Sequence, residues 1–265
     1  MGEPHHELYL VLTQSNRNPY LVNSKLLMKI DYTTEKQRHF NHAALTYLNL
    51  WATTDRHLID EIMSTSSEIN GEAMHRLAIK YKVVRGISSK DEEENPLTKQ
   101  AKQKQWQSIA DLVSKHAKMK SADPLVVGKL AHILSCNYGS KENQLLISAA
   151  TKFLWFAGRH SIKIYDSRAL GALLPHGEGK PDEKTIYPWF EKTWAEHISQ
   201  WNTELRTAIK GLERQLAWSA VPAALLQDAK VEIHKPWFSD RVFDQYLWAK
   251  GNPGKNMTDA ENAEA

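Results

Sequence analysis

Apolar residues recur at three- and four-residue spacing along most of this chain, which is the pattern of helices that bury one face. The clearest stripe consists of Phe40, Ala44, Tyr47, Leu48 and Trp51. The predicted helices cover residues 34–54, 55–63, 70–84, 97–120, 123–137, 143–157, 166–174, 187–218 and 235–251. Strand-like patterns occur only at residues 7–14 and 229–235. The sequence therefore predicts a mainly α fold.

Several helix boundaries carry residues that favour the ends of helices. Asp55, Asp123 and Asp166 stand where a carboxylate can accept hydrogen bonds from the first backbone N–H groups of a helix. Pro124 suits a first helical turn. Gly158 is expected to end the apolar helix before it, because glycine readily adopts the left-handed conformation found after helices. A short extended connector then leads to the helix that Asp166 caps.

The length of 265 residues fits one compact helical domain, expected over residues 1–250 and followed by a disordered tail, 251–265. The domain can divide into two lobes, 1–120 and 121–250, with a cleft between them. The hydrophobic fraction of 42% and the charged fraction of 25% are ordinary for a globular protein, so the composition does not indicate a membrane, fibrous or disordered protein. Cys136 is the only cysteine, which excludes an internal disulfide and a thiolate metal cluster.

The charge balance is mildly basic, with a formal net charge of +3, which is compatible with a nucleic-acid partner. The chain shows no secretory signal pattern and no run of eighteen apolar residues. We therefore expect a cytoplasmic monomer that does not insert into membranes. The sequence contains no recognisable metal or cofactor motif, so we expect neither.

The stretch 148–170 carries the most distinctive chemistry. Ser148, Lys152 and Trp155 recur at four- and three-residue spacing and should share one face of a helix. A lysine on an apolar helix is costly to bury unless its charge is paired or used. Asp166 opens the next helix, where the backbone N–H groups favour its ionised form. A purely structural interpretation stays open, in which Asp166 is only a cap and Lys152 reaches solvent.

The segment "SAATKFLWFAGRHSIKIYDSRA" resembles the catalytic region of the helix-hairpin-helix DNA glycosylases, over about residues 125–175. Ile164, Tyr165 and Asp166 stand where that superfamily has a hydrophobic pair and its catalytic aspartate. The family's glycine hairpin is absent, and "SCNYGSKENQ" occupies its place. The resemblance implies a helical DNA glycosylase fold and removal of an altered base from DNA.

The resemblance implies that the Asp166 carboxylate stabilises positive charge on the sugar as the N-glycosidic bond breaks. Lys152 is the second candidate catalytic residue, but it precedes Asp166 by only fourteen residues, and Lys141 precedes it by twenty-five. Neither spacing matches the family's lysine, whereas Ser148 lies nearer the expected place. We therefore expect hydrolysis by water, with lyase activity through a lysine as the alternative.

The extruded base needs a pocket with aromatic walls, and flanking phosphates need cations. The candidate substrate-binding residues are Ser148, Trp155, Tyr165 and Tyr138. The candidate phosphate-binding residues are Arg168, Ser167, Arg159, His160, Lys163 and Lys141. The resemblance permits excision of a hypermodified base from phage DNA as an antiviral defence, or a role in DNA repair. The alternatives from other classes are a non-catalytic helical module that binds nucleic acid or protein, and a structural helical protein.

Overall fold

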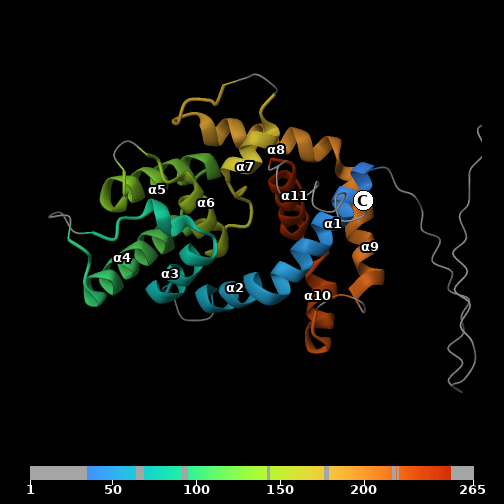
Figure 1. The fold of residues 1–265 in the computed structure, drawn as a ribbon, viewed down its shortest axis with the longest axis horizontal. Coiled ribbons are helices and arrows are strands. Elements are labelled where there is room, and N and C mark those ends of the chain that lie inside the picture. Colours follow the sequence, from blue (N-terminus) through green and yellow to red (C-terminus); the bar gives the residue numbers. More distant parts are fainter. Residues whose placement is uncertain are drawn as a thin grey trace, which may run out of the picture. The chain divides into compact units, whose positions relative to one another are not determined.

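The structure is a computed structural model that describes residues 35–63, 69–90, 95–141, 144–175, 179–216, 219 and 221–251. The described residues are mainly helical, which confirms the predicted fold class (Figure 1). The helices are α1 (Glu35–Leu50), α2 (Arg56–Met63), α3 (Gly71–Lys80), α4 (Lys99–Ala117), α5 (Asp123–Tyr138), α6 (Ile147–Phe156), α7 (Ser167–Leu173), α8 (Ile186–Gln200), α9 (Asn202–Gln215), α10 (Leu226–Glu232) and α11 (Pro236–Lys250). None of them has the length and apolar composition needed to cross a membrane.

Helix packing joins segments that are far apart in the sequence. Helix α1 packs against α9 and α11, and α11 also packs against α7. Helix α3 packs against α4, and α6 contacts α2, α3, α4 and α5. Figure 1 shows α11, in red, beside α1, in blue. The sequence boundary expected at residue 120 does not coincide with a break in these contacts, because α4 packs against both α5 and α6.

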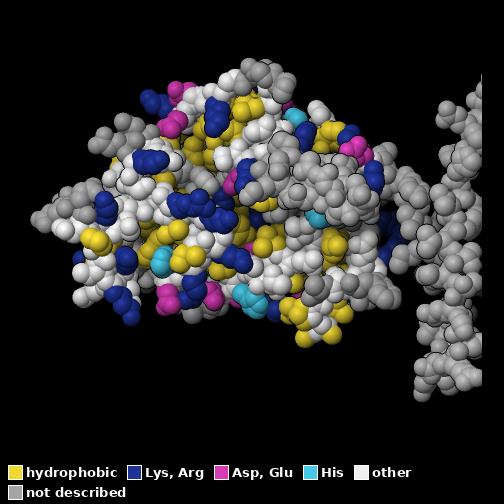
Figure 2. Space-filling model, viewed as in Figure 1, with side chains coloured by type: hydrophobic (Ala, Val, Ile, Leu, Met, Phe, Trp, Pro, Cys, Tyr) yellow, Lys and Arg dark blue, Asp and Glu magenta, His cyan; other side chains and the backbone are white. Residues whose placement is uncertain are grey.

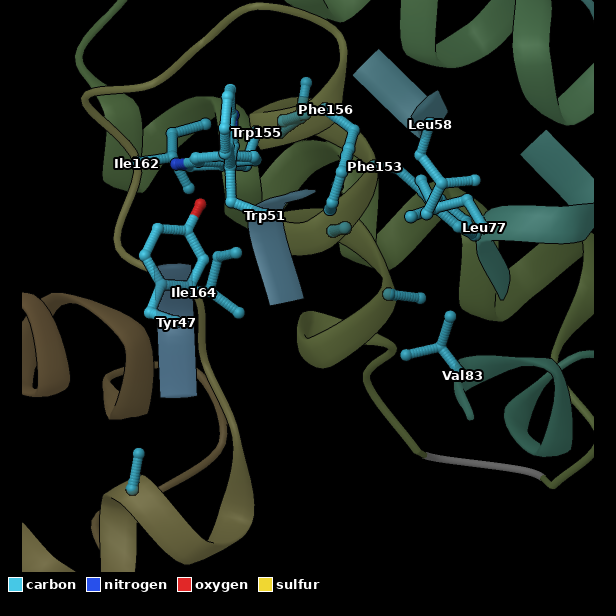
Figure 3. Close-up of a cluster of buried hydrophobic side chains, with 14 of the residues drawn as sticks. Tyr47, Trp51, Leu58, Leu77, Val83, Phe153, Trp155, Phe156, Ile162 and Ile164 are labelled. Atoms are coloured by element: carbon cyan, nitrogen blue, oxygen red, sulfur yellow. The ribbon is translucent and has the colours of Figure 1, made fainter. Parts of the chain in front are cut away.

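The core contains the apolar stripe predicted for residues 40–51. All five residues of the stripe on α1 and the turn after it are buried, with at most 3% of any of them exposed. Figure 3 shows Tyr47 and Trp51 from this segment close to Trp155, Phe156 and Ile162. Burial of large aromatic side chains is the main stabilising contribution available to a helical core of this kind.

Two local predictions were wrong. Residues 229–235 do not form a strand, since α10 covers most of them and Ala229 and Ile233 are buried at helical spacing. Asp55 is not the N-cap of a second helix: α1 passes through a π-helical turn, η1 (Trp51–Asp55), directly into α2. This turn places Asp55 in the interior, with no exposed surface. The strand expected at residues 7–14 and the tail beyond residue 251 lie outside the described residues.

The chain reverses after α3 through a left-handed residue that is not glycine. Lys82 has φ 56° and ψ 22°, a conformation that costs a side-chain-bearing residue about 1–2 kcal/mol. Lys82 begins the short 3₁₀ turn η2 (Val83–Gly86), and its side chain is exposed.

We expect Lys82→Gly to raise the free energy of unfolding by up to about 1 kcal/mol, because glycine adopts this conformation without strain. Urea unfolding measures the change. The control is Lys129→Gly within α5, where glycine should lower stability by about 1 kcal/mol. Equal losses in the two variants would show that Lys82 is not strained.

Candidate active site

Helix α6 is buried on almost every side. From Ile147 to Phe156 only Ser148 is partly exposed, and Lys152 keeps only 4% of its surface exposed. The structural alternative in which Lys152 reaches solvent is therefore wrong. Neighbouring helices pack around most of α6, which is why most of its residues are apolar.

The connector from α6 to α7 is held by hydrogen bonds to α6 and α8. The Tyr165 backbone N–H donates to Thr151 Oγ1 at 3.2 Å, and the Tyr187 hydroxyl donates to the Lys163 carbonyl at 3.2 Å. Gly158 has φ +91°, as expected for the residue that ends α6. The Asp166 side chain accepts a hydrogen bond from the Arg168 N–H at 3.0 Å. The predicted cap on α7 is thus confirmed.

This arrangement brings the two candidate catalytic residues together. Lys152 Nζ lies 2.7 Å from Ser148 Oγ, 3.3 Å from the Tyr165 carbonyl oxygen and 3.6 Å from Asp166 Oδ2. Burial lowers the pKa of Lys152 to about 8, although the Asp166 carboxylate acts to raise it. About a tenth of the amine is therefore unprotonated at pH 7. The Asp166 side chain is 32% exposed, so the carboxylate is open to an incoming molecule.

These side chains line a cavity of about 1030 Å³. Ser148, Lys152, Tyr165 and Asp166 all contribute to its wall. Burial raises the pKa of Tyr165 to about 12, so its hydroxyl stays protonated and can donate a hydrogen bond. Among the residues that the structure describes, eight lysine or arginine residues and three carboxylates line the cavity. Figure 2 shows Lys and Arg side chains gathered over the part of this face where α6 and α7 lie.

The inner wall contains a buried ionic cluster that the sequence analysis did not identify. Arg241 Nη1 donates to Asp244 Oδ2 at 3.0 Å, and Arg241 Nη2 lies 3.6 Å from Asp55 Oδ2. The Tyr81 hydroxyl donates to Asp55 Oδ1 at 2.5 Å, and Trp194 Nε1 donates to Asp244 Oδ1 at 2.9 Å. Burial raises the pKa of Asp244 to about 6.

Two predicted substrate-binding residues are structural. Trp155 is 1% exposed and packs against Phe156, His160 and Trp237. Figure 3 shows Trp155 within the cluster of buried side chains that includes Phe156. Tyr138 ends α5, packs against the core and does not line the cavity. Their expected role as base-stacking walls was therefore wrong.

Three predicted phosphate-binding residues are held by other parts of the chain and do not line the cavity. Arg159 donates to the carbonyls of residues 119 and 121 and to the carboxylate of Asp123. His160 lies between two tryptophan rings, and burial lowers its pKa. Lys163 pairs with Asp240 at 2.6 Å. Carboxylates neutralise Arg159 and Lys163, and ring contacts hold His160, so we assign structural roles to the three residues.

The other three predicted phosphate-binding residues do reach the cavity. Lys141, Ser167 and Arg168 all line it. The Arg168 guanidinium lies 4.3 Å from the centre of the Trp248 ring, and Trp248 is 38% exposed at the cavity edge. Cation–π contact of this kind fixes the orientation of both side chains.

Cofactor and metal chemistry has few candidate ligands here. Among the described residues, no three histidine, cysteine, aspartate or glutamate side chains are close enough to hold a metal ion. Cys136 Sγ lies 3.7 Å from His132 Nε2 on the exposed side of α5, a neighbour that the sequence analysis overlooked although it stands one helical turn earlier.

Comparisons with protein families, curated proteins and solved structures found no match to this chain. The chain is therefore assigned to no family, and the functional argument depends on the geometry of the site.

Proposed function

We propose that the protein is a DNA glycosylase that removes a modified base, with Asp166 and Lys152 as its catalytic residues. The observation that supports this most is the partly deprotonated Lys152 amine, 3.6 Å from the Asp166 carboxylate in the wall of a basic cavity. A carboxylate and an amine at this separation suit cleavage of a bond whose breaking leaves positive charge on a sugar carbon.

The charge and size of the cavity support a DNA substrate. Excess cations in the lining favour a polyanion, and the volume of about 1030 Å³ exceeds what one unmodified base needs. The exposed Trp248 ring and the protonated Tyr165 hydroxyl can contact the face and the edge of an extruded base. A bulky modified base, including one from phage DNA, is the substrate we propose.

Two nucleophiles fit the site. Water oriented by Asp166 is favoured by the sequence, because neither Lys152 nor Lys141 has the spacing from Asp166 that the lysine of the helix-hairpin-helix glycosylases has. The Lys152 amine is the one that the geometry favours, because its lowered pKa makes it nucleophilic near neutral pH. Attack by this amine on the sugar C1′ would displace the base, which leaves with the bonding electron pair and takes up a proton. Opening of the sugar ring at the C1′–O4′ bond would then leave an imine that borohydride reduces to a stable protein–DNA adduct.

The decisive experiment incubates the protein with DNA from ordinary cells and from phages that carry modified bases, and then measures released base. We expect release to be lost in Lys152→Gln and unchanged in Lys129→Gln, which removes an exposed lysine from α5. Borohydride should trap the native protein and not Lys152→Gln. Release without trapping would assign water as the nucleophile. No release from any DNA would favour the non-catalytic module.

The pH dependence of release tests the role of Lys152. Below its pKa of about 8, the neutral amine fraction rises tenfold per pH unit. We therefore expect kcat/KM to rise through this range and to level off above about pH 8, since kcat/KM reports the pKa values of the free enzyme. A profile that is flat between pH 6 and 9 would contradict amine catalysis.

A further inference from the structure

We propose that five exposed cations, Lys80, Lys82, Arg85, Lys99 and Lys102, form one surface that binds the sugar–phosphate backbone of duplex DNA beside the cavity. We call these five residues the α3–α4 basic surface. The inference depends on the proposed function for its choice of DNA as the partner. It places DNA-binding residues on α3, on the turn after α3 and on α4, all outside the segment 148–170.

The surface begins at the cavity itself. Lys80, Lys82 and Arg85 line the cavity, and all three side chains are exposed. Lys80 ends α3, and the other two belong to the turn that follows it. DNA that places a base near Asp166 would therefore lie within reach of these cations.

The packing of α3 on α4 continues the surface beyond the cavity. The Gly71 N–H donates to Gln107 Oε1 at 3.0 Å, and the His75 ring stacks on Trp106 with ring centres 4.7 Å apart. The two helices thus run in opposite directions. From the Gly71–Gln107 contact, Lys80 and Lys99 each lie about 12–14 Å along their helices, at the same end.

Other contacts support this continuity. Burial lowers the pKa of His75 on α3, and the Lys102 charge on α4 adds to the effect. Gln105 Nε2 donates to the Ser88 carbonyl at 3.0 Å, which ties α4 to the chain just after Arg85. Figure 2 shows Lys and Arg side chains over α4 on the same face as those over α6 and α7.

These cations have no counter-charges among the described residues. No ion pair joins any of the five to a carboxylate within the described ranges. The first turn of α4 carries Lys99 and Lys102 and no acidic residue. Lysines near a helix N-terminus are electrostatically unfavourable, and a bound anion would offset that cost.

Lys82 provides a separate indication. Its left-handed backbone, with φ 56°, favours glycine, yet a lysine occupies the position and extends its charge from the cavity rim. The sugar–phosphate backbone suits the α3–α4 basic surface, because duplex DNA carries a negative charge about every 1.7 Å along its axis.

The test compares two full-length variants that lose the same charge. One carries Lys82→Gly, Lys99→Gln and Lys102→Gln. The other carries Arg206→Gln, Lys210→Gln and Arg214→Gln, which removes three exposed cations from α9, all outside the cavity lining. Fluorescence anisotropy with a duplex of about 30 base pairs measures Kd across a range of salt concentrations, and urea unfolding checks that both variants fold.

We expect the first variant to bind at least about tenfold more weakly at 0.15 M salt. The slope of log affinity against log salt should fall by about 2 to 3, since each phosphate contact contributes about 0.9. The α9 variant should keep most of the native slope. Equal weakening in both variants, or tighter native binding to duplex RNA of the same sequence, would overturn the proposal.

The outcomes separate the two proposals. If the first variant loses DNA binding selectively while the native protein releases no base from any DNA, the surface stands and the glycosylase proposal fails. If the native protein releases base and the first variant binds DNA normally, the glycosylase proposal stands and the surface is wrong.

Discussion

Replacing Asp166 by Asn should slow base release by about 10²–10³-fold while leaving the protein folded. The carboxylate is proposed to stabilise positive charge on the sugar, and preorganised electrostatic groups of this type contribute about that much to rate. Asparagine caps helices about as well as aspartate, so the hydrogen bond from the Arg168 N–H should be kept. Single-turnover release of base and the urea-unfolding midpoint together measure the two effects.

Two further variants separate catalysis from capping. Asp166→Ala should lose the rate and also about 1 kcal/mol of stability, because alanine cannot cap α7. Asp182→Asn makes the same chemical change at an aspartate that accepts a hydrogen bond from the Lys184 N–H outside the large cavity, and its rate should be native. An Asp166→Asn protein with the native rate would leave Asp166 only its role as a cap.

The local part of the site could be predicted from the sequence because its signals are local. An apolar helix, a glycine that ends it and an aspartate that opens the next helix lie within a few turns of one another. Those signals place Asp166 at a helix start, and the structure bears this out. They do not show which helices pack around α6, so the prediction that Trp155 binds the substrate was wrong.

The inner wall of the cavity could not be predicted because its contacts join distant segments. Arg241 meets Asp55 from the other end of the chain, and no spacing rule relates the two. The π-helical turn that points Asp55 inward leaves no clear mark in the pattern of apolar residues. Arg241 and Asp244, at three-residue spacing beside the apolar residues Val242 and Phe243, were a usable signal.

Removing Arg241 is expected to destabilise the fold more than any other change considered above. Arg241 is 2% exposed and compensates Asp55, which is fully buried, and Asp244. Arg241→Met leaves both carboxylates without their cation, and breaking a buried ion pair in this way costs about 3–5 kcal/mol. Arg56→Met is the matched control, because it breaks a more exposed pair with Asp228 and should cost no more than about 1 kcal/mol.

The pH dependence of that loss identifies its cause. Burial raises the pKa of Asp55 and Asp244, and the Arg241 charge opposes the rise, so Arg241→Met should raise both further. A carboxyl whose pKa is higher in the folded state loses stability as pH rises above its ordinary value of 3.8. The deficit of Arg241→Met in urea unfolding should therefore be smaller near pH 4.5 than at pH 7. A deficit that stays constant over this range would mean that lost packing around Trp155, rather than uncompensated charge, accounts for the instability.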